Sequence, residues 1–572
     1  MKIIKSVASF LTLAFLLLSL PHAPTFFQPI VPVKAAIKGK LSPALASNLQ
    51  RFDSKGRLLV IISTYKTPSV ALKAELRKIG AEIGEQFQTI NGFAADVPFD
   101  ALGLLASNVE VQAVTPDRAI FPSMDVTRPT VGADIAQQSL GLDGNGIGVV
   151  VIDSGINDHG DLRSNKPGQG DGGKSRIVYA ENFVAGESTT NDLYGHGTHV
   201  AGIVAGDGSA SSGSNSFRTI KGIAPRANLI NLRVLDGQGN GSESAAIAAL
   251  DKAIALKTMF NIRVINLSIG AGVFGSYASD PLCRAADRAW NAGMVVSVAA
   301  GNLGKVDPQT PLSGRTENIY GLITSPGNSP HVITVGATNA KGTANPADDA
   351  ITSYSSRGPT LFDHIVKPDL GAPGNRVKSL LAENSLLALD PIFEKVDPAY
   401  YLKDGKGKKI SYVIVSGTSM SAPAVAGAAA LMLQQSPGLN NHTIKMRLMA
   451  SARKQLMRQC EHCNIFTVGA GVLDIPAALA HTGIATSSKS AIAVRNPDPN
   501  DGHVRILIDA SWGSQSEWAM GVIWGDGVIW GDGVIWGDGV IWGDGVIWGD
   551  GTPISDPVTQ FQQQRFISAF GD

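Results

Sequence analysis

Long apolar runs alternate with helical periodicities through the central part of the chain. The run IGVVVID (147–153) is apolar until its final acid, which is typical of a buried central strand in a parallel sheet. Over 242–260, isoleucine and leucine recur at helical spacing, which predicts a helix. Strands that alternate with helices in this way predict an α/β fold with a doubly wound, mostly parallel sheet. Four further strands are predicted at ANLINLRVLD, RVINLSIG, GMVVSVAAGN and PHVITVGAT.

A segment nearer the N-terminus has shorter elements. Its predicted strands cover 57–64, 92–98 and 109–114, and its predicted helices cover 69–80 and 100–107. Strand–helix–strand units of this size fit a small ferredoxin-like α+β fold. From the residues alone, such a unit is either a binding module or a removable pro-segment.

The stretch Val415–Pro423 (VSGTSMSAP) leads into the small-residue run AVAGAAALMLQQ. Because apolar residues occupy every face of this run and Pro437 follows it, we expect a buried helix that ends near Ser436. Ser419 would lie at the N-terminus of this helix, where unpaired backbone N–H groups favour developing negative charge. The alternative is an ordinary helix-capping serine.

Composition narrows the class of protein. A chain of 572 residues is too long for one compact domain, and its 44% of apolar residues can fill a sizeable core. A net charge of zero gives no electrostatic reason to expect nucleic acid or an anionic membrane as partner. The three cysteines do not make a disulfide framework. Cys460 and Cys463 have C-x-x-C spacing without a second ligand pair, so a short-loop disulfide or two thiols are expected rather than a zinc knuckle, and Cys283 is expected in the core.

The N-terminus has the layout of a secretory signal peptide. Lys2 and Lys5 precede an uncharged apolar run that is short for a bilayer span. A small-residue cleavage site near Ala35 assigns residues 1–35 to the signal peptide, and an uncleaved membrane anchor is the alternative. We therefore expect a secreted, extracellular protein.

Four polar residues fall where predicted strands or helices begin or end. Asp153 ends an apolar strand, and His196 lies in the glycine-flanked turn YGHGTHVAG. Asn302 closes SVAAGN, and Ser419 begins a helix. Taken singly, each is explained as a turn former, a solvated histidine or a cap. Doubly wound sheets bind ligands at the carboxyl ends of their strands, where the four together would supply orienting acid, base, oxyanion donor and nucleophile.

The strings VIDSGI, GHGTHVAG, VAAGN and GTSMSAP, in this order, resemble the four signature blocks of the subtilisin-like serine proteases (subtilases, peptidase family S8). The order Asp, His, Ser is also that of the family, whereas α/β-hydrolases run Ser, acid, His. The resemblance covers about residues 123–482, which we expect to form the catalytic domain. It implies a serine endopeptidase that hydrolyses peptide bonds through an acyl-enzyme intermediate.

The resemblance implies a role for each site residue. Ser419 would attack the scissile carbonyl, His196 would take its proton and pass it to the leaving amine, and Asp153 would orient the imidazole. The Asn302 side chain and the Ser419 backbone N–H would form the oxyanion hole. His199, the second histidine of its block, is expected to be a buried helix residue.

Substrate contacts are implied in the same way. Two segments resemble the family strands that pair with the substrate backbone, which would give broad specificity. A glycine beside Asn302 would let that backbone come close. The implied residues are Ser268, Ile269, Gly270 and Gly301 on one side and Gly239 and Gly241 on the other.

The chemistry of the family requires no cofactor. Asp161, in HGDL, resembles a family calcium ligand, but the matching loop after the histidine block is replaced by DGSASSGSNS. A structural calcium ion at Asp161 and an exposed turn carboxylate are therefore both retained as interpretations.

Residues 56–122 resemble the inhibitory pro-domain of the family, which assists folding and is then cut away by the enzyme, and we assign residues 36–122 to this domain. We expect the cut within 117–127 and therefore a zymogen that processes itself. The expected partners are protein or peptide substrates and this pro-domain, acting as an intramolecular inhibitor.

Residues 483–572 form a tail of different composition, in which Gly521–Asp550 contains five copies of GVIWGD. An even repeat places every tryptophan on one face of an extended chain, whereas Gly-Asp turns would give a meander. Such a β-prone segment indicates an appendage for surface binding or self-association; a slippage-expanded repeat that packs on the catalytic domain is the alternative.

Two functions remain in competition. The first is a secreted serine endopeptidase, and the alternative is a surface or adhesion protein that uses an inactive protease-like scaffold. The presence of acid, base, oxyanion donor and nucleophile favours the enzyme, because a scaffold needs none of the four.

Overall fold

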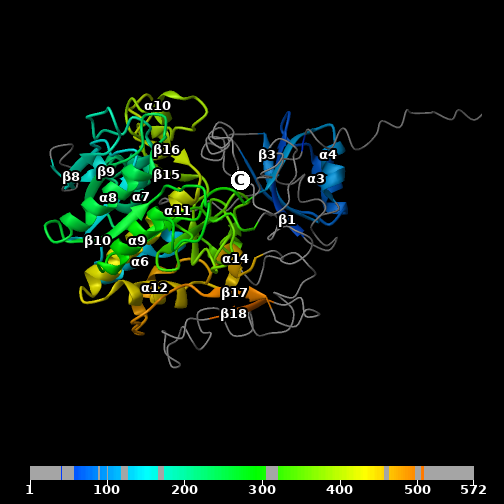
Figure 1. The fold of residues 1–572 in the computed structure, drawn as a ribbon. Coiled ribbons are helices and arrows are strands. Elements are labelled where there is room, and N and C mark those ends of the chain that lie inside the picture. Colours follow the sequence, from blue (N-terminus) through cyan, green and yellow to red (C-terminus); the bar gives the residue numbers. More distant parts are fainter. Residues whose placement is uncertain are drawn as a thin grey trace, which may run out of the picture. The chain divides into compact units, whose positions relative to one another are not determined.

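The computed structural model describes residues 57–87, 91–98, 101–116, 126–164, 173–304, 320–456, 463–495 and 504–507, together with Lys40. The chain divides into two compact units, Met1–Ile120 and Phe121–Asp572, and each is described by itself (Figure 1). The predicted signal peptide, most of the predicted cleavage region and the GVIWGD repeats lie outside the described residues. Within the described ranges, no helix combines the length and apolar character needed to cross a membrane.

The first unit is an antiparallel sheet with two helices. The elements are β1 (Arg57–Thr64), α3 (Val70–Lys78), β2 (Glu82–Gln86), β3 (Gly92–Pro98), α4 (Ala101–Ser107) and β4 (Val111–Pro116). The strand order β2-β3-β1-β4 is that of the split βαβ arrangement expected from the sequence. Strand β2 was not predicted, because EIGEQ is an edge strand with little apolar character.

The second unit is built on a large, mostly parallel sheet of order β13-β12-β11-β10-β5-β9-β8, with β14 also paired to β12. All strand pairs are parallel except β12 with β13. The predicted doubly wound α/β fold is confirmed. The strands are β5 (Gly148–Asp153), β8 (Ile177–Asn182), β9 (Asn228–Arg233), β10 (Ile262–Leu267), β11 (Val295–Ala299), β12 (Ile333–Asn339), β13 (Ala350–Ile351) and β14 (Leu370–Pro373).

Four helices cover this sheet. Helix α7 (His196–Ala205) packs against α11 (Thr418–Gln435), and α8 (Glu243–Leu256) packs against α9 (Pro281–Asn291) (Figure 1). Along the chain, β5 is followed by β8 and β9 on one side of it, and then by β10, β11 and β12 on the other side. The direction reverses at β5, so the ends of β5 and β10 form the switch point where ligands bind in such sheets.

Short elements complete the second unit. A hairpin of β15 (Val377–Leu380) and β16 (Tyr412–Val415) leads directly into α11. The other elements are α5 (Thr127–Val131), α6 (Ala133–Leu140), β6 (Arg163–Ser164), β7 (Lys174–Ser175), α10 (Leu386–Leu389), α12 (Asn441–Ala450), α14 (Ile465–Val468), α15 (Ile475–Ala480), β17 (Ile492–Arg495) and β18 (Val504–Leu507), with short 3-10 turns at Gly160–Leu162, Ser209–Ser211, Pro346–Asp348 and Pro398–Tyr400.

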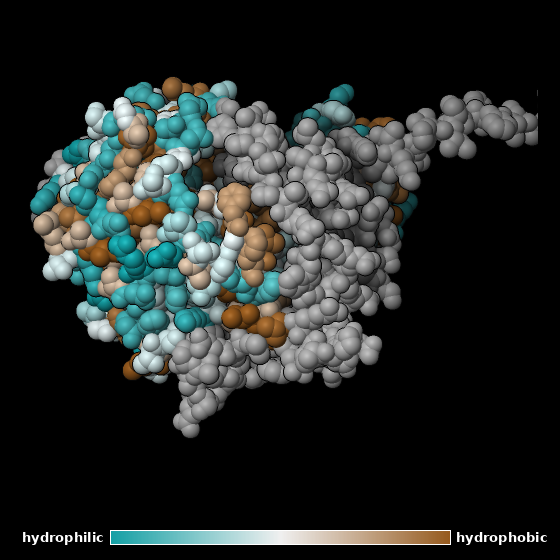
Figure 2. All heavy atoms as spheres, viewed as in Figure 1, coloured by the Kyte–Doolittle hydropathy of each residue, from teal (hydrophilic) through white to brown (hydrophobic). Residues whose placement is uncertain are grey.

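Hydrophilic residues are mixed with small groups of hydrophobic ones on the face drawn in Figure 2. The interior is apolar: helix α11 is buried on all sides, as its sequence predicts, and ends at the cap residue Ser436.

Cys283 is a buried thiol, as expected. Cys463 takes part in a disulfide, so of the two predicted states, disulfide or free thiol, the disulfide holds for Cys463. Cys460 lies outside the described residues.

Candidate active site

Strand β5 carries Asp153 at its carboxyl end, where the carboxylate is fully buried. An unpaired charge in that position would be costly, and the structure supplies partners. Asp153 Oδ1 accepts the backbone N–H of Ser154 at 2.7 Å and lies 2.7 Å from His196 Nδ1. Since the carboxylate can only accept, Nδ1 carries the proton and Nε2 is the basic nitrogen of the neutral ring.

His196 is the first residue of α7, directly after Gly195, whose φ of 104° favours glycine. Only 12% of its side chain is exposed. Burial by itself lowers the pKa of His196, but the charge and hydrogen bond of Asp153, followed by the charge of Asp192, outweigh burial and raise that pKa above 6.5. The pair is therefore arranged to stabilise an imidazolium.

Ser419 is the second residue of α11, as predicted for a helix N-terminus. In the described part of the chain, its Oγ donates to the carbonyl of Ser268 at 3.2 Å and not to the imidazole. In return, Ser268 Oγ donates to the carbonyl of Ser419 at 2.8 Å. The end of β10 thus holds the predicted nucleophile in place.

Asn302 follows β11, and its side-chain oxygen accepts both the backbone N–H of Thr418 at 2.9 Å and its hydroxyl at 3.0 Å. These contacts make Nδ2 the donor end of the amide. Gly417, with φ 148°, approaches this end: a Cβ there would lie 3.2 Å from Asn302 Nδ2. A side chain at 417 would therefore crowd the predicted oxyanion donor.

The predicted substrate segments lie at the same edge of the sheet. Gly301, with φ 102°, donates its N–H to Thr418 Oγ1 at 3.2 Å. Gly239 lies in a turn in which Asp236 Oδ1 accepts two backbone N–H groups, and its Cβ position is 3.0 Å from the Tyr194 ring. The Tyr194 ring in turn lies 6.1 Å from that of His196. Ile269 and Gly241 belong to these two segments, whose role in substrate binding stays a prediction.

Thr324 lies against two of the predicted substrate glycines, Gly270 and Gly301. A Cβ on Gly270 would be 2.5 Å from Thr324 Oγ1, and a Cβ on Gly301 would be 2.8 Å from Thr324 Cγ2. The backbone N–H of Thr324 also donates to the carbonyl of Ala300 at 3.1 Å. A β-branched side chain held in this way fills the space between the glycines.

The predicted calcium ligand Asp161 is fully buried, so it is not an exposed turn carboxylate. Its Oδ1 accepts the N–H of Ala210 at 2.7 Å and the hydroxyl of Ser209 at 3.2 Å. Its Oδ2 accepts the hydroxyl of Tyr412 at 2.7 Å. Calcium needs oxygen lone pairs directed at it, whereas these neighbours direct protons at the carboxylate, so the set does not fit a calcium ion.

A buried guanidinium supplies positive charge beside this carboxyl group. Arg176 Nη2 donates to the carbonyl oxygens of Asp161 and Ala205 at 2.6 Å each, and Nη1 donates to that of Ala227 at 3.0 Å. Burial lowers the pKa of Arg176 to about 10, and the charges of Asp207 and Asp161 oppose that shift, so the group stays cationic at neutral pH. Within the described ranges, no cluster of three or more His, Cys, Asp or Glu could hold a metal ion.

His199 is buried in α7, as predicted, and does not lie where a base would act. Its Nε2 donates to the carbonyl of Val377 at 3.1 Å. Burial, followed by the nearby charge of His196, lowers the pKa of His199 to about 3. His199 therefore stays neutral and ties α7 to β15.

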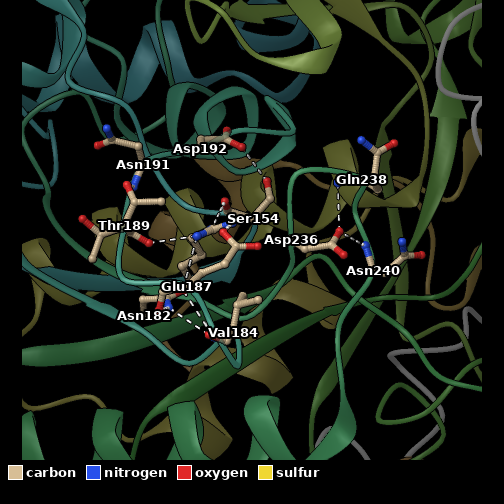
Figure 3. A network of polar contacts seen from close by, with 12 residues as sticks. Ser154, Asn182, Val184, Glu187, Thr189, Asn191, Asp192, Asp236, Gln238 and Asn240 are labelled. Atoms are coloured by element: carbon tan, nitrogen blue, oxygen red, sulfur yellow. Dashed lines mark hydrogen bonds and ion pairs between the residues drawn. The ribbon is translucent and has the colours of Figure 1, made fainter.

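Several residues around the site were not singled out from the sequence. Ser154 and Asp192 form the hydrogen bond seen in Figure 3, and Thr418 orients Asn302. The sequence offered one signal for Asp192, a carboxylate four residues before the predicted base His196, but it did not reveal the burial of Asp192 or its bond to Ser154. Thr324 has no such signal, because nothing in TSPG separates a lining threonine from a turn residue.

Comparison with known proteins gives the same region a family. Residues 144–471 match the model described as the subtilase family, peptidase S8. The chain is 34% identical over 403 residues to serine protease AprX of Bacillus subtilis, an alignment that covers 68% of this chain and 80% of AprX. It is 31% identical over 325 residues to subtilisin DY of Bacillus licheniformis, an alignment that covers 57% of this chain and 89% of subtilisin DY. It is 30% identical over 415 residues to subtilisin E of Bacillus subtilis, an alignment that covers 72% of this chain and 86% of subtilisin E.

Proposed function

The chain belongs to the subtilase family of serine peptidases, and from that premise we propose that it is a secreted serine endopeptidase, made as a self-processing zymogen, that acts through Asp153, His196 and Ser419. The observation that carries the proposal is the buried contact of 2.7 Å between Asp153 Oδ1 and His196 Nδ1 at the switch point of the sheet. This contact fixes the imidazole tautomer in which Nε2 can accept a proton.

Catalysis begins when Ser419 Oγ attacks the carbonyl carbon of the scissile bond and its proton passes to His196 Nε2. The oxygen of the tetrahedral intermediate takes hydrogen bonds from Asn302 Nδ2 and the Ser419 N–H at the N-terminus of α11. The imidazolium then gives its proton to the leaving amine as the C–N bond breaks. Water, activated by the same imidazole, releases the acyl group and restores Ser419.

The resting hydrogen bond from Ser419 to the Ser268 carbonyl is compatible with this sequence of steps. Contacts between nucleophile and base are often loose before substrate binds. The proposal requires that the Ser419 hydroxyl leave the Ser268 carbonyl and donate to the imidazole when substrate binds.

Hydrolysis of an internally quenched peptide blocked at both ends tests the endopeptidase activity directly. The wild type is expected to cleave it, and a Ser419→Ala variant is expected to lose about 10⁶-fold in kcat, the effect of losing the serine in subtilisin, a family relative. Equal cleavage by both proteins would remove Ser419 from the mechanism. Absence of cleavage by a folded wild type would favour the scaffold alternative.

The zymogen step has its own test. Mass spectrometry of the protein purified from culture medium is expected to find wild type beginning within 117–127, while Ser419→Ala keeps the preceding unit. Identical processing of both proteins would assign maturation to another protease. Recovery of the protein only with the cells would contradict secretion. Deletion of 486–572 in the same experiment tests the proposed surface-binding or self-associating tail: unchanged secretion, solubility and cell association would contradict that role.

A further inference from the structure

A second buried carboxylate lies beside the catalytic pair and has no role in the steps above. Asp192, four residues before His196, is 1% exposed. We propose that Asp192 is a positioning residue: through Ser154 and the first turn of α7 it holds His196 against Asp153, and its charge is the second anion that stabilises the imidazolium. This inference rests on the proposed function.

The contacts of Asp192 surround His196 along the chain. Oδ1 accepts the backbone N–H of Gly195 at 2.6 Å and the hydroxyl of Ser154 at 2.8 Å. Oδ2 accepts the backbone N–H of Thr198 at 2.7 Å. One carboxylate thus holds the residue before His196 and the second residue after it, which fixes the backbone that carries the imidazole.

Ser154 connects Asp192 to Asp153, as Figure 3 shows for the Ser154–Asp192 half of the connection. The Ser154 hydroxyl accepts the N–H of Gly197 at 2.9 Å and has a single proton to donate. Its oxygen is 2.8 Å from Asp192 Oδ1 and 3.2 Å from Asp153 Oδ1, so the proton goes to Asp192. Without Asp192 the proton would turn to Asp153 Oδ1 and compete there with the imidazole.

The donors around Asp192 favour its ionised form. Every side-chain contact named above is with a donor, which is the surrounding of an ionised carboxylate. Burial raises the pKa of Asp192 above its usual value, and the hydrogen bonds of Gly195, Thr198 and Ser154 reduce that rise.

His199 and Arg233 are further titratable or charged groups close to His196 or to Ser154. Asp153 and Asp192 raise the pKa of His196, and His199 stays neutral on the same helix. Arg233, at the end of β9, is fully buried and donates through Nε to the Ser154 carbonyl at 3.2 Å. Its Nη2 pairs with Glu187 at 2.6 Å, which offsets the positive charge.

The pH dependence of kcat/KM for a peptide substrate tests the inference. The base must be neutral, so the acid limb reports the pKa of His196. Loss of the Asp192 anion should lower that pKa and move the acid limb of Asp192→Asn at least about 0.5 pH unit to lower pH. Because the first turn of α7 loosens, plateau kcat should fall about ten- to a hundredfold with little change in KM.

Two further variants keep the test decisive. Ser154→Ala cuts the connection but keeps the anion, so it should lower kcat with a smaller shift of the acid limb. Asp251→Asn, which removes an exposed carboxylate on α8, is the control and should leave both kcat and the acid limb unchanged. If Asp192→Asn does not fold, a Ser154→Ala variant with wild-type kcat overturns the inference.

The failure of this inference can be told from failure of the proposed function. A wild type that hydrolyses peptide, together with an Asp192→Asn variant of unchanged acid limb and kcat, overturns the positioning role alone. A folded wild type without activity overturns the proposed function, and the positioning role with it.

Discussion

The side-chain oxygen of Asn302 accepts the backbone N–H of Thr418 at 2.9 Å, which joins the loop after β11 to the first residue of α11. Ser419 is the next residue along α11. One hydrogen bond therefore fixes the amide that would donate to the oxyanion and the helix start that carries the nucleophile. A donor held before substrate arrives costs little reorganisation during the reaction.

Asn302→Ala should lower kcat by about 10²–10³, the loss found for one oxyanion-hole donor in subtilisin, a family relative. KM should change little, because the interaction strengthens only in the transition state. Steady-state kinetics with a peptide anilide would measure both constants. Asn339→Ala, at a turn where Asn339 accepts the Lys341 N–H, is the control and should be silent. A kcat within a few-fold of wild type would remove Asn302 from the oxyanion hole.

The raised pKa of His196 predicts activity at neutral and alkaline pH. Its usual pKa is 6.5, and the charge of Asp153 acts to raise it despite burial. Since only the neutral imidazole accepts the serine proton, kcat/KM should fall as pH decreases through a midpoint above 6.5. A pH series of kcat/KM checks this, and a midpoint below 6.5 would contradict the assigned role of the Asp153–His196 pair.

The sequence was sufficient for the parts of the site that terminate regular elements. Asp153 ends one continuous apolar strand and Asn302 follows another, and Ser419 lies in the first turn of a helix of small residues. Helix α8 was also predicted close to its observed bounds, because its apolar spacing is regular.

The features that the sequence did not predict depend on contacts between segments that are distant in the chain. Nothing near Asp161 in the chain reveals that Tyr412 donates to it across the fold. Strand β2 is stabilised by pairing with β3, which its own polar sequence does not encode. Asp192 required knowledge that Ser154 turns its hydroxyl toward it.

The protein surroundings of Asp161 predict stability that is independent of calcium at this position. In a Ser419→Ala background, which prevents self-digestion, Asp161→Asn should cost about 1–3 kcal/mol of unfolding free energy because buried donors lose their anionic partner. Thermal unfolding should show the same loss of Tm in calcium and in EDTA. A loss that appears only in calcium would establish Asp161 as a calcium ligand. If calcium raises Tm equally in the Ser419→Ala protein with and without Asp161→Asn, any bound calcium ion lies at another site.

The position of Thr324 predicts a preference for small side chains on the acyl side of the scissile bond. Peptide anilides that end in Ala should be cleaved faster than those that end in Phe, because Thr324 fills the space between Gly270 and Gly301. Thr324→Gly should raise kcat/KM for Phe relative to Ala by about tenfold or more. Thr324→Ser, which removes only the methyl group, should give an intermediate ratio. A ratio that is the same in all three proteins would contradict the prediction.

The most direct test of the account is covalent labelling by a serine-directed fluorophosphonate, followed by peptide mapping. We expect one adduct, on Ser419, that forms in wild type, is absent from Ser419→Ala and forms far more slowly in His196→Ala. Folded wild type that takes no adduct, or an adduct on another serine, would contradict the assignment of Ser419 as the nucleophile.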